Sequence, residues 1–251
     1  MNLKYITCSD PREDISVSEM MRLLHFAPQI EIGVQASPGA MATGRPRHKW
    51  FQQLMSLVSN IDTPLNVALH VNYSWCNDMC SGRIPPEIQE WLMLRHVRTN
   101  APAVRRIQLN IGDGTNAFDA NKTAKLIHDF PDHEFIFPYN SVVSSQVAKL
   151  HDTGANFSLL YDSSYGYGKS PDAWYGPVYS SHPMGYAGGL SPENVAQNLD
   201  LISEQLPSDY TTWIDAEGRL MKPGTRQMDL SRARSYVDIA LRWSEYKSKQ
   251  R

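Results

Sequence analysis

The feature that most constrains the fold of this chain is a regular alternation of short apolar runs with longer amphipathic stretches. The apolar runs are continuous, as in strands that are buried on both faces of a parallel sheet. The first intervening stretch, SVSEMMRLLHF, places Val17, Met20, Met21 and Leu24 at helical spacing. The alternation occurs eight times, which predicts strands at 3–7, 30–35, 65–71, 106–111, 134–138, 157–161, 183–187 and 211–215.

Strands that alternate with helices pair in parallel through right-handed crossovers, so eight such units in 251 residues predict a closed (β/α)8 TIM barrel. We expect this barrel to be a single domain over 1–251. A doubly wound open sheet is the alternative, but it would need a glycine fingerprint after the first strand, where SDPREDIS has no glycine. Helices are predicted near Ser16, over 47–58, 86–98, 117–129, 142–151 and 172–175, from Ser191, and over 229–245.

One connection is unusually long for a segment between a strand and a helix. It covers about 72–85 and reads NYSWCNDMCSGRIP, which is rich in aromatic and sulfur side chains. We expect an extended loop here, and long ordered loops on the C-terminal face of a barrel often cover a functional site.

The composition limits which classes of binding partner and which cellular compartment we expect. The chain has 24 basic and 26 acidic residues and a formal net charge of -2, so it provides no basic field for nucleic acid and no polybasic patch for a membrane surface. It has no apparent leader and no spanning apolar run, and its three cysteines are an odd number, so we expect a soluble cytoplasmic protein without disulfides. Cys76 and Cys80 lack a second Cys or His pair, so no metal site is expected.

The carboxyl ends of the strands in a barrel converge on one mouth, so residues at these ends are the candidates for chemistry. Asp162 ends the sixth strand and precedes a loop with Gly166, Gly168 and Lys169. No lysine lies at a strand end, which disfavours an aldolase that forms a Schiff base, and His70 stands alone as a core histidine. The other candidates at or after strand ends are Cys8, Arg47, Gln108 and Asp215.

A phosphate site is predicted from the last two connections of the barrel. The segment AGGLSPENVAQNL places Gly188 and Gly189 after the seventh strand, where backbone N–H groups can hold a phosphate. Gly218 and Arg219, in the connection after the eighth strand, would form the second wall. The neighbouring Glu217 would oppose phosphate binding unless its carboxylate points away.

These segments resemble the phosphoribosylanthranilate isomerase family. YDSSYGYGKSPDAW is similar to the strand-six segment of that family, YAGGLSPENVAQNL to its phosphate motif, and WIDAEGRLMKPGTRQMDLSRARSYV to its final segment. YITCSDPRED resembles the strand-one segment, and RPRHKWFQQLM resembles the Pro-Arg stretch after strand two. The chain differs in carrying Ala216 and Glu217 before Gly218 in place of Ser-Ser-Gly, and Asn110 in place of a histidine.

The resemblance implies an isomerase of tryptophan biosynthesis that performs an Amadori rearrangement of a phosphorylated aminoaldose to a ketose without a cofactor. It implies that Asp162 is the general acid, that Cys8 is the general base and that Arg47 holds a carboxylate of the substrate. Gln108 and Asp215 are predicted to contact the same small phosphorylated substrate. The oligomeric state stays open.

Two alternatives to the isomerase remain. The first is a barrel that binds a phosphorylated or sugar-like ligand without isomerising it, in which aromatic side chains stack on the ligand. The second is a phosphosugar lyase in which Asp162 and Asp215 act as a carboxylate pair. The aromatic side chains that favour the binding protein are Tyr73, Trp75, Tyr139, Tyr165, Tyr167 and Tyr186.

Overall fold

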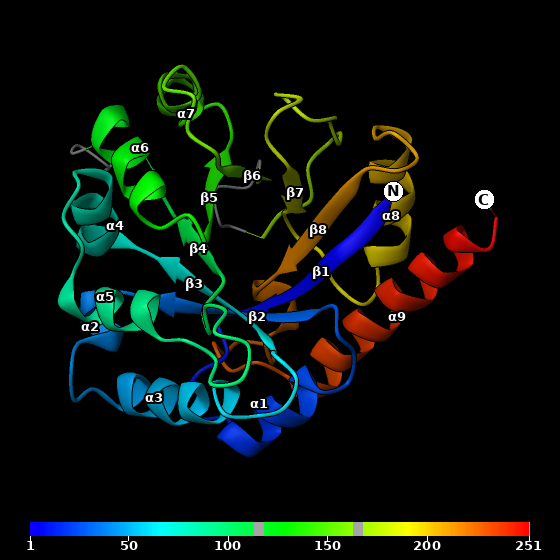
Figure 1. The fold of residues 1–251 in the computed structure, drawn as a ribbon. Helices are drawn as coiled ribbons and strands as arrows, with labels where there is room; N and C mark the ends of the chain where they lie inside the picture. The colour runs from blue at the N-terminus through cyan, green and yellow to red at the C-terminus, as the bar shows by residue number, and fades with distance from the viewer. Residues whose placement is uncertain (113–117, 163–167, 251) are drawn as a thin grey trace.

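Eight parallel strands close into a barrel in which each strand pairs with its neighbours in sequence and the eighth pairs with the first (Figure 1). The structure is a computed structural model, and it describes residues 1–112, 118–162 and 168–250. The fold is therefore a single (β/α)8 TIM barrel, as the alternation in the sequence predicted. The strands are β1 (Asn2–Ser9), β2 (Ile30–Ala36), β3 (Asn66–Val71), β4 (Arg106–Leu109), β5 (Glu134–Tyr139), β6 (Ser158–Tyr161), β7 (Met184–Ala187) and β8 (Thr211–Ala216).

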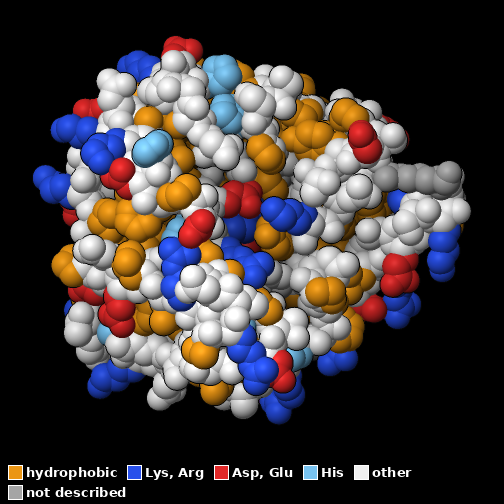
Figure 2. All heavy atoms as spheres, in the orientation of Figure 1, with side chains coloured by type: hydrophobic (Ala, Val, Ile, Leu, Met, Phe, Trp, Pro, Cys, Tyr) orange, Lys and Arg blue, Asp and Glu red, His pale blue; other side chains and the backbone are white. Residues whose placement is uncertain are grey.

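Helices surround the barrel and connect its strands (Figure 1). They are α1 (Val17–Leu24), α2 (Pro38–Met41), α3 (Pro46–Val58), α4 (Tyr73–Cys80), α5 (Pro86–Met93), α6 (Ala120–Asp129), α7 (Ser144–His151), α8 (Val195–Glu204), the short 3-10 helix η1 (Gly218–Leu220) and α9 (Leu230–Ser248). No helix within the described residues is long and apolar enough to span a membrane. The face shown in Figure 2 carries acidic and basic side chains intermixed.

The connection over 72–85 contains the helix α4, so the prediction of an extended loop was wrong. Trp75, Cys76, Met79 and Cys80 are buried, and their spacing is that of one helical stripe. The helical spacing of these residues could be seen in the sequence. Their side chains pack α4 into the core between the strands and the helices.

Three other predicted helices differ from the structure. The segment 172–175 has no helix, and α5 ends at Met93 because Leu94 is extended and Arg95 pairs with Pro102 in a bridge. α8 begins at Val195 rather than at Ser191. The first position of the predicted helix 117–129 lies outside the described residues.

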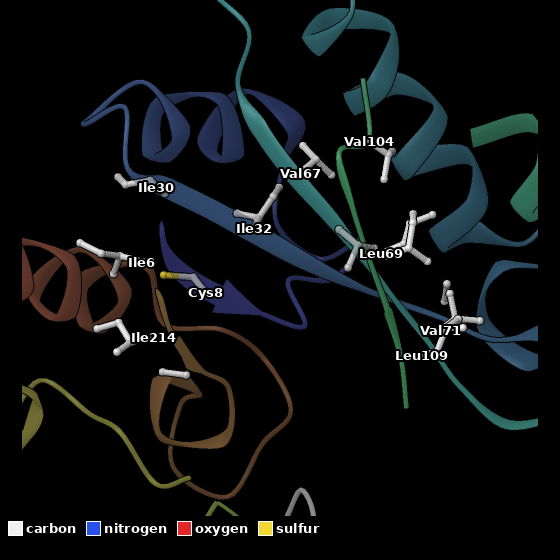
Figure 3. Packing of buried hydrophobic residues seen from close by; sticks show 14 of the residues in the cluster. Ile6, Cys8, Ile30, Ile32, Val67, Leu69, Val71, Val104, Leu109 and Ile214 are labelled. Atoms are coloured by element: carbon white, nitrogen blue, oxygen red, sulfur yellow. The ribbon is translucent and has the colours of Figure 1, made fainter. Parts of the chain in front are cut away.

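Two apolar regions hold the barrel together. The larger one lies between the strands and the helices, and Figure 3 shows part of it around Ile6, Ile32, Val67 and Ile214. The smaller one lies inside the barrel and consists of Tyr5, Ile136, Leu160, Ala187 and Trp213. Because neighbouring residues in a strand point to opposite faces, β1 contributes Ile6 to the first region and Tyr5 to the second.

A buried arginine crosses the inside of the barrel. The guanidinium of Arg106 lies 4.5 Å from the ring centroid of Tyr5 and 4.3 Å from that of Trp213. Its Nη1 donates to Glu31 Oε1 at 2.7 Å, and its Nε lies 3.3 Å from Glu134 Oε2. Together these contacts join β1, β2, β4, β5 and β8 through one side chain.

Replacing this arginine tests its role in the fold. We expect Arg106→Met to lower the free energy of unfolding by about 3–5 kcal/mol, because it leaves the Glu31 carboxylate buried without its cation. The measurement is urea unfolding of the purified protein.

The matched control is Arg98→Met, which removes an exposed ion pair to Asp62 and should cost less than about 1 kcal/mol. Adding Glu31→Gln to Arg106→Met should recover part of the loss. Equal effects of Arg98→Met and Arg106→Met would contradict the role of Arg106.

Candidate active site

A cavity of about 780 Å³ opens at the C-terminal ends of the strands. Side chains from all eight strands or from the residues just after them line it, which is the arrangement expected at the mouth of a barrel. The predicted residues that the structure brings together here are Arg47, Gln108, Asp162, Gly188, Gly189, Asp215, Gly218 and Arg219. Gly166, Tyr165 and Tyr167 lie outside the described residues.

Cys8 is the one predicted site residue that does not line the cavity. Its side chain is fully buried in the layer between strands and helices, and Figure 3 shows it among Ile6, Ile32 and Ile214. Burial, followed by the nearby charge of Asp215, raises the pKa of the Cys8 thiol, so the reactive thiolate is disfavoured. The geometry therefore argues against Cys8 as the general base, and the inward-facing neighbours on β1 must be considered instead.

Asp215, at the end of β8, is a buried carboxyl group that lines the cavity. Burial raises the pKa of Asp215 to about 7. A hydrogen bond from Ser9 Oγ to Asp215 Oδ1 at 2.6 Å acts in the opposite direction and lowers this pKa. The charge of Asp162 also raises this pKa, which indicates that the two carboxyl groups influence each other. A carboxyl group with a pKa near neutrality can accept and release a proton at physiological pH.

His70 lies beside Asp215 in the same cavity. Burial lowers its pKa to about 4, so its ring is neutral at pH 7, and its Nε2 lies 4.0 Å from Asp215 Oδ2. Gly33 makes room for this ring, since a Cβ at Gly33 would lie 2.5 Å from the His70 ring and 2.6 Å from Ser9 Oγ. The predicted core histidine is thus buried, but it also forms part of the cavity wall.

A row of side-chain amides runs along the wall formed by β2, β3 and β4. Gln108 Nε2 donates to Asn110 Oδ1 at 2.7 Å, and Asn110 Nδ2 donates to Asn72 Oδ1 at 2.9 Å. Asn72 Nδ2 donates to Gln35 Oε1 and also to the backbone oxygen of His70. Gln35 Nε2 then donates to Glu217 Oε2 at 3.0 Å, so each amide in the row donates toward Glu217.

Glu217 ends this row; the sequence predicted it as a residue that would oppose phosphate binding unless its carboxylate points away. Glu217 is exposed at the cavity, and partial desolvation by the surrounding atoms, with the charges of Asp10 and Asp215, raises its pKa to about 7. Its hydrogen bond to Gln35 directs it toward β2, whereas the glycine turn follows β7 on the other side of β8. The carboxylate is therefore held away from the predicted phosphate site.

The opposite wall, formed by the connections after β7 and β8, can receive an anion. Gly188 and Gly189 have φ values of +120° and +62°, and a Cβ at Gly189 would lie 2.6 Å from Ser170 N, so this turn requires glycine. Within the described residues, the backbone N–H groups of both glycines donate no hydrogen bond. Arg219 and Arg226 also line this wall, and neither has a carboxylate partner in the described part of the chain. Arg226 was missed in the sequence, although its position in a basic connection beside Arg219 was a signal.

Arg47, in contrast, is already paired. Its Nη1 donates to Asp10 Oδ1 and its Nε donates to Glu13 Oε2, both at 3.0 Å. Arg12 donates to Asp10 Oδ2 through Nε at 3.0 Å and through Nη2 at 2.5 Å. The two arginines and two carboxylates form a cluster without net charge at the β1–β2 side of the mouth.

The comparisons with known proteins concern the fold. N-(5'-phosphoribosyl)anthranilate isomerase from Pyrococcus furiosus is 14% identical over 95% of this chain and 98% of its own, with a TM-score of 0.53. Phosphoribosyl anthranilate isomerase from Thermus thermophilus is 16% identical over 96% and 99%, with a TM-score of 0.56. The native KDPGal structure is 12% identical over 97% and 96%, with a TM-score of 0.52. No protein-family model and no curated protein matches the chain. At these identities the likeness shows a shared barrel fold.

The raised pKa of Asp215 predicts a pH-dependent cost in stability. The pKa of this buried acid is higher in the folded protein than in the unfolded chain. Its contribution to stability is therefore fully present at a pH below the unfolded pKa and is lost as the pH rises through the folded pKa. We expect Asp215→Asn to be more stable than the wild type, with a difference that grows by about 2–3 kcal/mol between pH 5 and pH 8. Chemical unfolding at a series of pH values measures this difference. The exposed change Asp209→Asn is the control and should show no such trend, and a flat profile for Asp215→Asn would refute the raised pKa.

Proposed function

We propose that this protein isomerises a phosphorylated aminoaldose to a ketose by an Amadori rearrangement that needs no cofactor, with Asp162 and Asp215 as the proton-transfer groups. The observation that carries the proposal is the carboxyl group of Asp215, which shares one cavity with Asp162 and a glycine turn and whose pKa of about 7 lies near physiological pH. The fold shared with isomerases that act on a phosphoribosyl compound supports the same reaction class.

The reaction needs two proton transfers at different atoms of the sugar. Asp162, in its protonated form, donates a proton to the ring oxygen; the bond between C1 and that oxygen breaks, and the nitrogen lone pair forms a protonated imine with C1. Asp215 then removes the proton from C2 to give an enolamine, which becomes the ketose when C1 gains a proton and the hydroxyl on C2 loses one. Asp215 replaces Cys8 as the base, because a carboxylate with a raised pKa is a stronger base than an ordinary one and faces the cavity.

The phosphate of the substrate binds at the wall formed by Gly188, Gly189, Gly218, Arg219 and Arg226. Unpaired N–H groups and guanidinium groups form charge-assisted hydrogen bonds with phosphate oxygens. His70 stays neutral, so it adds no charge to the cavity and can only contribute a ring nitrogen to hydrogen bonding.

The roles of the two carboxyl groups and of Cys8 are separable by mutation. We expect Asp162→Asn and Asp215→Asn each to lower kcat/KM by ~10² or more, because each removes one proton-transfer group. Cys8→Ala should change kcat/KM by less than about threefold, since the thiol lies outside the cavity. The assay follows conversion of N-aryl phosphoribosylamines labelled at C1 by NMR.

The pH profile checks the direction of proton transfer. If Asp215 is the base, kcat/KM rises as pH increases through about 7; a fall over this range would make Asp215 the acid. A wild-type protein that binds these compounds without converting them would end the isomerase proposal.

The arginines of the phosphate wall give a separate test of substrate binding. We expect Arg219→Ala and Arg226→Ala each to weaken binding of ribose 5-phosphate by ~10-fold or more, because each removes a cation that has no carboxylate partner among the described residues. Lys222→Ala is the control, since Lys222 belongs to the same connection but does not line the cavity. Isothermal titration calorimetry measures the affinities, and equal losses in all three variants would point to a general effect of charge.

A further inference from the structure

The carboxyl group of Asp215 is held by a single direct hydrogen bond among the described residues. Ser9 Oγ donates to its Oδ1 at 2.6 Å, and both side chains are buried. This distance is typical of a hydrogen bond from a hydroxyl group to an ionised carboxylate. Ser9 does not line the cavity, so it holds Asp215 from behind, on the side away from a ligand.

The second oxygen of this carboxyl group is in a different position. Within the described part of the chain Oδ2 accepts no hydrogen bond, and His70 Nε2 lies 4.0 Å from it, beyond hydrogen-bonding distance. Oδ2 is also not one of the enclosed side-chain atoms that lack a partner. Because Asp215 and His70 both line the cavity, Oδ2 is the oxygen that a ligand can reach.

The strands around Ser9 fix its side chain in this place. Thr7 pairs with Asp215 across β1 and β8, and Ser9 is the next residue of β1 on the same inward face. Ser9 pairs with Gly33 on its other side. A Cβ at position 33 would lie 2.6 Å from Ser9 Oγ and 2.5 Å from the His70 ring, so glycine is needed here for both side chains to fit.

Other titratable and charged groups act on Asp215 without bonding to it. Burial has the largest effect on its pKa and the Ser9 hydrogen bond the next largest, whereas Arg106 lowers and Asp162 raises the pKa through their charges. Among the described residues, none of these groups donates a hydrogen bond to Asp215, so Ser9 alone fixes the direction of the carboxyl group. The groups near it are Cys8 on β1, His70 on β3, Arg106 on β4, Asp162 after β6, Glu217 after β8 and Tyr236 on α9.

We propose that Ser9 is a positioning residue: by engaging Oδ1, it directs Asp215 to take up and release its proton at Oδ2, the oxygen that faces the cavity. The hydroxyl proton of Ser9 occupies one lone pair of Oδ1, whereas Oδ2 has no such donor in the described residues. Ser9 acts through Asp215 and does not touch a ligand, because it lies outside the cavity lining. The exchange of this proton with a substrate rests on the proposed function.

Two measurements on Ser9→Ala test the proposal. The first is ¹³C NMR of protein labelled at the aspartate carboxyl carbons, in which the Asp215 signal is assigned by its loss in Asp215→Asn. We expect the midpoint of its titration to rise by about one pH unit, because the buried carboxylate loses a charge-assisted hydrogen bond.

The second measurement is turnover, in the assay for the proposed reaction. At a pH where Asp215 is fully ionised in both proteins, kcat of Ser9→Ala should remain ~10-fold below that of the wild type, with little change in KM. The reason is that the carboxylate is then free to rotate, so its reacting oxygen is no longer held toward the substrate.

Conservative variants and a matched control separate positioning from a structural role. Ser9→Thr keeps the hydroxyl donor and should behave as the wild type, and Ser9→Cys, a weaker donor, should place the midpoint between those of the wild type and Ser9→Ala. Thr212→Ala is the control, because Thr212 is as deeply buried as Ser9 but donates to the backbone oxygen of Met184 at 2.7 Å. It should destabilise the protein to a similar extent and leave midpoint and kcat unchanged.

The outcomes distinguish this proposal from the proposed function. An unchanged midpoint in Ser9→Ala, or an equal shift in Thr212→Ala, would overturn the role of Ser9. Full recovery of kcat by Ser9→Ala at high pH would also overturn it, since Ser9 would then affect acidity without positioning the carboxylate. A wild-type protein without turnover would reject the isomerase, and the titration would still decide this proposal: a midpoint shifted in Ser9→Ala and restored in Ser9→Thr supports it.

Discussion

The charge of Arg106 inside the barrel is the constraint on which the rest of the structure depends. A guanidinium cannot be left unpaired in the interior, so Glu31 and Glu134 must also turn inward, and Thr7 donates to Glu31 at 2.8 Å. The same charge reaches the cavity, where it lowers the pKa of Asp215 against the stronger effect of burial. The ion-pair network around Arg106 therefore also helps to set the pKa of Asp215 in the cavity.

The strands could be predicted from sequence because strands buried on both faces give continuous apolar runs, which polar turns interrupt. A continuous apolar run does not show as easily which side chains point into the barrel and which point toward the helices. Cys8 and Ser9 are adjacent, yet Cys8 faces the helices and Ser9 faces Asp215. A shift of one residue exchanges the two faces of a strand, so a motif match at a strand end does not decide which side chain reaches the mouth. The alternation of apolar Ile6 and Cys8 with polar Thr7 and Ser9 was the available signal.

The residues that line the candidate site could be predicted, because barrel topology places them. The ion pairs that these residues form with other side chains could not. Parallel strands in a barrel deliver their C-terminal residues to one mouth, which is why Gln108, Asp162 and Asp215 line the same cavity. Whether the charge of Arg47 is free depends on Asp10 and Glu13, which precede it by more than thirty residues. No local sequence pattern predicts that these residues pair with it. Its side chain lies at the expected place, but its charge is already balanced.

The row of amides from Gln108 to Glu217 has a consequence for communication across the mouth. Each amide donates through its nitrogen in the same direction, and the oxygens of Asn110, Asn72 and Gln35 accept, so the dipoles are aligned as peptide dipoles are in a helix. The direction cannot reverse, because Asn72 also donates to a backbone oxygen and an ionised Glu217 cannot donate. A ligand hydroxyl that donates to the oxygen of Gln108 would therefore polarise the whole row and stabilise the charge on Glu217. Binding at one side of the cavity would change the acidity of a group on the other without any movement of the backbone.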